Sequence, residues 1–328
     1  MKNLIVKMLL LVFAICVINV ACKKVPDGFL SPNIRYEETP ILVPQGIVKV
    51  SSALTLDGSA MPIKVKLLHV YDRATGKNVD DLFNKQYPIK VWTGLYDPKI
   101  DNTLEKINAK RKDSLVNPIS INPASGQLEA NIATLNLPAG KYEFDLEVSN
   151  SAGTKTFSKI GKFDLNAAAP FEIPAAGSQV AFKVGAENIT KTLSPTLISV
   201  VKLADAPDKV IVRMVDKNGV PFNAAAGEIG RRPLSGTAVG FLQTMDLYSL
   251  SVTNFADRME FIYGTVPFPL SSLGNGFNYY YRIPTQYVHF DDPTLPDDQY
   301  SCNARFSFRA FIPGTYEVTV KIPGVTHR

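Results

Sequence analysis

One sequence pattern occurs twice in this chain and constrains its fold more than any other feature. Residues 137–148 and residues 312–322 each place a proline and then a glycine ahead of a tyrosine, after which apolar and polar residues alternate. In the first copy the predicted inward positions are Tyr142, Phe144, Leu146 and Val148. Alternation with a period of two is typical of strands with one buried face. Two copies that each close a run of strands predict an all-β fold of two β-sandwich domains in tandem.

Other segments carry the same alternation, and helix is scarce. Strands are predicted within residues 47–67, 119–163, 180–184 and 209–216, and an Asn-Gly turn at 218–219 indicates a hairpin. One short charged surface helix is expected within residues 102–115. Alanine-rich and proline-rich residues near 166–177 interrupt the strands. The sequence therefore predicts a first sandwich over residues 46–166 and a second over residues 167–328.

The N-terminus has the composition of an export signal. Lys2 and Lys7 precede an apolar run that starts at Met8 and ends at Ala21, directly before Cys22. A basic head, a short apolar stretch and a small residue before the cleavage point are typical of a secretory signal peptide, here residues 1–21. The Ala-Cys pair resembles a bacterial lipobox, which implies that Cys22 is lipidated and becomes the mature N-terminus. Residues 22–45 are then the lipidated N-terminus and a proline-rich tether.

Charge and cysteine content narrow the classes of function. The formal net charge is +5, and the predicted signal peptide carries two of the basic residues. Basic residues are dispersed among acidic ones without a stripe interleaved with aromatics, so no nucleic acid is predicted as a partner. Cys302 is the one cysteine beyond the predicted lipidation site, so no internal disulfide is expected. We expect Cys302 to be a small buried side chain within a packed core.

Residues with catalytic or metal-binding chemistry are few. The chain has three histidines, His69, His289 and His327, and no nucleophile-elbow sequence, so neither a catalytic triad nor a zinc site is predicted. No pair of carboxylates stands out for glycoside hydrolysis, and we predict no enzyme activity and no cofactor. One loop gathers oxygen ligands that suit calcium, namely Asp291, Asp292, Asp297 and Asp298. Their spacing matches no established calcium loop, so solvated turn-forming residues are the favoured interpretation.

Aromatic residues are the remaining functional signal. Flat aromatic rings stack on the apolar faces of sugar rings, while polar neighbours bind the hydroxyl groups. Candidate glycan-binding residues lie around the single tryptophan and around a run of three tyrosines: Trp92, Tyr96, Tyr279, Tyr280, Tyr281, Arg282 and Tyr287. Tyr280, Tyr281 and Arg282 are favoured because three successive tyrosines of a strand cannot all face inward. The alternative for each aromatic side chain is a place in the core.

Residues 119–163 resemble the last strands of cadherin-like and other immunoglobulin-like bacterial surface domains, through a strand, an Asn-Pro…Gly turn and a Gly-x-Tyr-x-Phe strand. With the lipobox and a length of 328 residues, the chain resembles Bacteroidetes-type surface lipoproteins encoded with polysaccharide-uptake systems. The resemblance implies an immunoglobulin-like first sandwich and an outer-membrane lipoprotein exposed at the cell surface. It also implies non-catalytic binding of a polysaccharide or oligosaccharide beside an outer-membrane transporter. The alternatives are a structural or adhesion module that binds protein partners and a hydrolase or lyase on the same scaffold.

Overall fold

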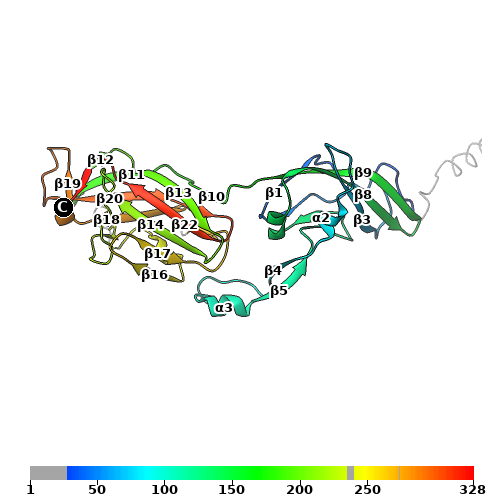
Figure 1. Ribbon diagram of the computed structural model, residues 1–328, viewed down its shortest axis with the longest axis horizontal. Helices are drawn as coiled ribbons and strands as arrows, with labels where there is room; N and C mark the ends of the chain where they lie inside the picture. Colours follow the sequence, from blue (N-terminus) through cyan, green and yellow to red (C-terminus); the bar gives the residue numbers. More distant parts are fainter. Residues whose placement is uncertain (1–27, 235–239, 273) are drawn as a thin grey trace, which may run out of the picture. The chain divides into compact units, whose positions relative to one another are not determined.

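The computed structural model describes residues 28–234, 240–272 and 274–328 (Figure 1). The predicted signal peptide and the proposed lipidation site Cys22 lie outside these residues. The described chain is built from strands with a few short helices, so the predicted all-β fold class is confirmed. It divides into two compact units: the first contains residues up to 89 and residues 114–168, and the second contains residues 90–113 and 169–328. No helix in the described part is both long and apolar enough to cross a membrane.

The first unit contains two sheets. Its four-stranded sheet has the order β1 (Ile41–Pro44), β9 (Gly153–Asn166), β8 (Gly140–Asn150) and β3 (Lys64–Asp72), with β1 parallel to β9 and the other pairs antiparallel. Its three-stranded sheet has the order β2 (Lys49–Val50), β7 (Leu128–Ala130) and β6 (Ile119–Ile121). The helix α2 (Asp80–Asn84) and the 3-10 turn η1 (Ile132–Asn136) connect strands. Side chains from both sheets share one hydrophobic core.

The core of the first unit confirms the inward positions predicted for the first copy of the repeated pattern. Tyr142, Phe144, Leu146 and Val148 are each at most 2% exposed. The Tyr142 hydroxyl donates a hydrogen bond to the carbonyl oxygen of Pro138, 2.9 Å away, as a tyrosine corner does in a sandwich. Phe144 lies against Gly161 of the neighbouring strand so closely that a Cβ on Gly161 would come within 2.0 Å of the ring. The glycine is therefore needed for the ring to fit.

The second unit contains two larger sheets and two short pairs of strands. One five-stranded sheet has the order β12 (Ala186–Leu193), β11 (Ser178–Lys183), β20 (Tyr300–Ser307), β18 (Asn278–Ile283) and β15 (Gly230–Arg231). The other has the order β13 (Leu197–Ala204), β22 (Thr315–Lys321), β14 (Lys209–Val215), β17 (Met259–Ile262) and β16 (Ser251–Asn254). The short pairs are β10 (Phe171–Glu172) with β21 (Arg309–Ala310), and β19 (Val288–Phe290) with β23 (Val325–His327). The 3-10 turns η2 (Met245–Leu247) and η3 (Thr285–Tyr287) complete the unit.

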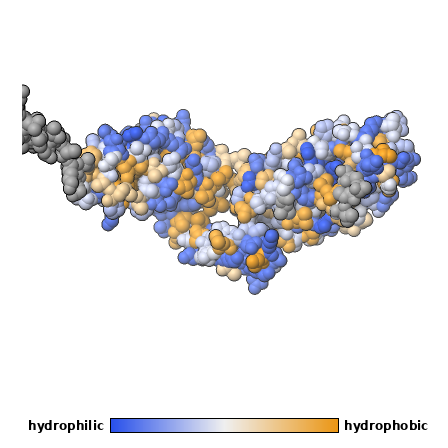
Figure 2. Space-filling model, turned by 180° about the vertical axis from the view of Figure 1, so that it is seen from behind, coloured by the Kyte–Doolittle hydropathy of each residue, from blue (hydrophilic) through white to orange (hydrophobic). Residues whose placement is uncertain are grey.

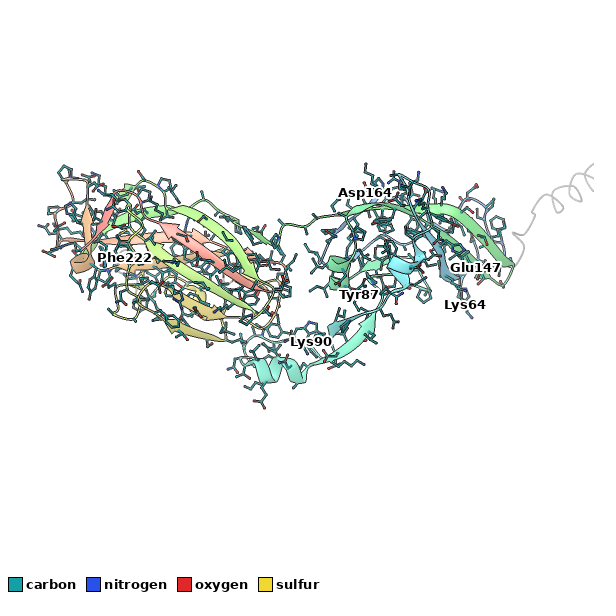
Figure 3. All side chains as sticks on the ribbon, viewed as in Figure 1. Lys64, Tyr87, Lys90, Glu147, Asp164 and Phe222 are labelled. Carbon is teal, nitrogen blue, oxygen red and sulfur yellow. The ribbon has the colours of Figure 1, made fainter. Side chains whose placement is uncertain are left out.

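Both large sheets of the second unit contribute to one core, in which Phe222 is fully buried (Figure 3). The second copy of the repeated pattern supplies Tyr316, whose hydroxyl lies 2.6 Å from the carbonyl oxygen of Ile312 and 3.1 Å from that of Pro170. Cys302 is 0% exposed, which confirms the expectation of a buried cysteine. Burial raises the pKa of its thiol to about 12.

Residues 90–113 form a segment that we call the arm. The sequence boundaries assign it to the first sandwich, whereas the structure groups it with the second unit. It begins within β4 (Tyr87–Trp92) and ends within β5 (Arg111–Val116), two strands that pair with each other, and Figure 3 marks Tyr87 and Lys90 on β4. The helix expected within residues 102–115 is shorter in the structure: α3 (Leu104–Ala109) starts after Thr103, whose side chain accepts a hydrogen bond from the N–H of Lys106. The helix ends at Ala109, and the chain continues into β5, which pairs with β4.

Candidate functional site

The arm holds a pair of neighbouring aromatic side chains, of which Trp92 is exposed and Tyr96 is half-buried. Trp92 is 44% exposed, and its ring centroid lies 5.5 Å from that of Tyr96, with 44° between the ring planes. Leu95, between them in sequence, is 91% exposed. Figure 2 shows hydrophobic and hydrophilic residues mixed over the surface of the arm. The structure thus brings together two of the predicted glycan-binding residues on an accessible surface, which we call the Trp92–Tyr96 pair.

A network of ionic hydrogen bonds holds the loop that carries this pair. The carboxylate of Asp101 is 1% exposed, accepts a hydrogen bond from the N–H of Asp97 at 2.7 Å, and pairs with the Lys110 ammonium at 2.7 Å. The backbone bond from Asp97 and the Lys110 ammonium lower the pKa of Asp101. Lys110 also donates to the carbonyl oxygen of Leu95 at 2.9 Å. These contacts order the loop before any ligand arrives, which reduces the entropic cost of binding.

Two contacts attach the arm within the second unit. The hydroxyl of Tyr96 hydrogen-bonds the side chain of Thr265, and burial raises the pKa of this tyrosine. Ile107 of α3 is 0% exposed and fits against Gly264, where an added Cβ would come within 2.4 Å of the Ile107 Cδ1 atom. The absence of a side chain at Gly264 therefore creates the space that Ile107 occupies.

One residue beside the aromatic pair was not singled out by the sequence. The guanidinium carbon of Arg111 lies 5.4 Å from the centroid of the Trp92 ring, a cation–π distance. Its Nη2 donates to the side-chain oxygen of Asn108 at 2.7 Å, whereas its buried Nε has no hydrogen-bond partner. Burial lowers the pKa of Arg111. The sequence predicts a helix that reaches residue 115, and it gives no sign that residues 111–116 form a strand paired with the one that carries Trp92.

The three successive tyrosines named as candidate glycan-binding residues do not present exposed rings. Tyr279, Tyr280 and Tyr281 of β18 are 0%, 8% and 4% exposed. The hydroxyl of Tyr279 donates to the carbonyl oxygen of Phe308, and that of Tyr281 accepts from the N–H of Met245. Both rings belong to the core, as expected for alternate residues of one strand, whose side chains share a face. Tyr280 does face the other side of the sheet, but other side chains cover it there.

Two further predicted residues are engaged within the protein. Arg282 forms a bidentate ion pair with Glu187, with nitrogen–oxygen distances of 3.0 and 2.7 Å. Its Nε donates to the side-chain oxygen of Asn303 at 3.0 Å. Tyr287 lies in η3, half-buried against the core of the second unit. Each residue therefore has a structural role: Arg282 forms an ion pair, and Tyr287 packs against the core.

The four aspartates considered for calcium each have a separate side-chain partner. Asp291 pairs with Lys217 at 2.5 Å, Asp292 with Lys191, Asp297 with His289 at 2.9 Å, and Asp298 with Arg328 at 2.8 Å. Within the described ranges, no group of three or more histidine, cysteine, aspartate or glutamate residues has the arrangement of a metal site. The loop's carboxylates therefore serve as surface ion pairs and turn-formers.

Comparisons with known proteins add little to this geometry. No protein-family model matches the chain, and neither does any curated protein sequence. Among solved structures, a SusE-like surface located polysaccharide binding protein from the heparin utilisation locus of Bacteroides thetaiotaomicron aligns with a TM-score of 0.25 and 8% identity. The alignment covers 89% of this chain and 54% of the other, so the chain spans about half the length of that protein. A TM-score of this size carries no argument about fold or function.

Proposed function

We propose that this protein is a non-catalytic, glycan-binding lipoprotein, and that the Trp92–Tyr96 pair contacts the sugar. The observation that carries the proposal is an exposed tryptophan beside a half-buried tyrosine, on a loop that is already ordered by the Asp101–Lys110 ion pair. A tryptophan that is 44% exposed leaves apolar ring surface in water, and covering it with the apolar face of a sugar is favourable.

Polar groups beside the aromatic pair suit the other requirement of a sugar, which is hydrogen bonding to hydroxyl groups. Arg111 lies over Trp92, and Asp97 and Lys99 belong to the same exposed loop. The further parts of the proposal rest on the sequence resemblance alone. They are lipidation at Cys22, a place at the outer membrane facing the cell surface, and association with a polysaccharide transporter.

Affinity electrophoresis tests the proposal directly. The chain from Lys23 to Arg328, which omits the predicted signal peptide and the lipidated cysteine, is run through gels that contain plant or host polysaccharides. Retardation by at least one glycan, lost in Trp92→Ala and in Tyr96→Ala, is the expected result. Leu95→Ala is the matched control, because it removes an exposed apolar side chain from the same loop without removing an aromatic ring. No retardation across the panel, or retardation that both aromatic variants retain, contradicts the proposal.

Binding of a protein partner is the second candidate function, and one observation favours it. β13 lies at the edge of its sheet and exposes Leu197, Val201 and Leu203 by 54–59%. A groove beside this strand is lined by residues that include Arg213 and Glu317. An exposed apolar edge strand can pair with a strand of another protein. Chemical crosslinking in membranes distinguishes the two candidates. If the protein binds a protein partner through β13, substitutions in β13 abolish the crosslinked complex, whereas Trp92→Ala does not.

A further inference from the structure

The five-stranded sheet that contains β18 has an outer face, turned away from the core, that carries several arginines. Strand register places Tyr280 opposite Arg305 and Arg282 opposite Asn303, so these four side chains share that face. Arg231 pairs with Tyr281, which places Arg232 next to Tyr280. The side chain of Arg232 crosses this face, and its guanidinium carbon lies 5.4 Å from the Tyr280 ring centroid and 4.7 Å from that of Phe182. We call Arg232, Arg282 and Arg305 the arginine cluster.

Arg232 lacks an anionic partner among the residues that the structure describes. Its buried Nε has no hydrogen-bond partner, and no ion pair or hydrogen bond joins its side chain to another described residue. Burial is the main cause that lowers its pKa, and the neighbouring Arg282 and Arg305 charges add to this effect. Cation–π contacts with two rings compensate only part of the cost of removing a guanidinium from water.

The other two members of the arginine cluster show that the local charge balance is positive. Glu187 neutralises Arg282 through its bidentate pair. Arg305 donates from Nη2 to the carbonyl oxygen of Ala176 at 2.8 Å, a neutral acceptor, and its own buried Nε has no partner. Three guanidinium groups thus face one carboxylate. All three arginine residues keep part of their surface exposed, so an anion from solution can reach them.

We infer that the arginine cluster is a subsite for an oxyanion, with Arg232 as its main ligand, and that it accepts the carboxylate or sulfate group of an acidic saccharide. Guanidinium groups bind both anions through paired N–H donors, which makes this chemistry common to uronic acids and sulfated sugars. The rings of Phe182 and Tyr280 hold the Arg232 guanidinium in place. This inference rests on the proposed glycan-binding function, because it specifies the charge of the glycan.

The test compares the retardation of the chain from Lys23 to Arg328 in gels containing neutral dextran, polygalacturonate or dextran sulfate. We expect Arg232→Gln to weaken binding to at least one of the acidic polymers by about tenfold or more, the usual effect of losing a charge-assisted contact. Arg309→Gln is the matched control. Arg309 also lies over aromatic rings, at 4.5 Å from Phe277 and 5.2 Å from Phe311, but it has Glu172 at 3.7 Å as a partner.

The outcomes separate this inference from the proposed function. If Arg232→Gln binds the acidic polymers as the unsubstituted protein does, or if Arg309→Gln loses as much affinity, the inference is overturned. The Trp92→Ala result then still decides the proposed function by itself. If neither these polymers nor the plant and host polysaccharides retard the protein, the proposed function fails, and thermal denaturation in sodium sulfate against sodium chloride at equal ionic strength decides the subsite. A sulfate-dependent rise in Tm that Arg232→Gln lacks and Arg309→Gln keeps supports a bare oxyanion site, whereas equal rises in all three proteins overturn it.

Discussion

Replacing Ile107 with alanine is expected to release the arm while the rest of the second unit stays folded. Ile107 is fully buried beside Gly264, and α3 has only six residues. A helix of that length has no stability of its own in water, so its order depends on this contact. Isoleucine-to-alanine changes at buried sites cost about 2–5 kcal/mol. Because few other apolar side chains of the arm are buried, we expect that cost to fall on the docking of the arm, whose open fraction rises by a factor of about 30 or more.

Tryptophan fluorescence and hydrogen exchange measure this effect. Trp92 is the only tryptophan in the chain, so its emission reports the arm and no other segment. We expect Ile107→Ala to change this emission and to accelerate exchange at the amides of α3, with exchange in β22 unchanged. Ile100→Ala, which removes a side chain that is 60% exposed in the same arm, is the control and should change neither signal. Equal protection of α3 in both variants, or a simultaneous loss of protection in β22, would refute the reasoning.

Three other predictions concern stability and reactivity. Tyr316→Phe should lower the free energy of unfolding by about 1–3 kcal/mol, as measured by urea denaturation, because the buried carbonyl of Ile312 loses its hydrogen-bond donor. Tyr142→Phe should have a smaller effect, because the Tyr142 hydroxyl has one carbonyl within reach whereas that of Tyr316 has two. Burial raises the pKa of Asp216, but hydrogen bonds from the backbone N–H groups of His327, Val220 and Asn218 outweigh it and leave the pKa below its usual value. Asp216→Asn should therefore cost about 1–3 kcal/mol at pH 7, and the difference from the unsubstituted protein should shrink as the pH falls below about 4; a difference independent of pH would contradict this. Cys302, with its pKa raised to about 12, should resist iodoacetamide in the native protein and react in urea, and rapid native labelling in a mass spectrum would show that it is not buried.

The strands of the core could be predicted from the sequence because their signal is local. Tyr142 and its alternating partners are inward, as predicted, since a period of two fixes which side chains share a face. The same rule separates Tyr280 from Tyr279 and Tyr281, but it cannot tell that Arg232 crosses the outer face and covers Tyr280. The side chain that covers Tyr280 comes from a distant part of the chain, and the alternation of residues within a strand cannot predict it.

The location of the arm is a second feature that the local pattern could not provide. The arm, residues 90–113, is grouped with the second unit, in which Ile107 fits against Gly264, far along the chain. Trp92 was among the candidates because of its residue type, whereas its exposure depends on how the arm folds. Residue type therefore found the aromatic pair, and tertiary contacts determined which of the other aromatic candidates are covered.

The position of β22 has a consequence for how the second unit forms during synthesis. β22 lies between β13 and β14, antiparallel to the first and parallel to the second, although it follows every other strand of that sheet in the sequence. Until residues 315–321 leave the ribosome, β13 has no partner and β14 lacks one of its two neighbours. The nascent chain therefore carries unpaired strand edges from the time β13 emerges until β22 follows it, a state that aggregates readily. A chaperone that holds the growing chain extended would protect it until β22 emerges.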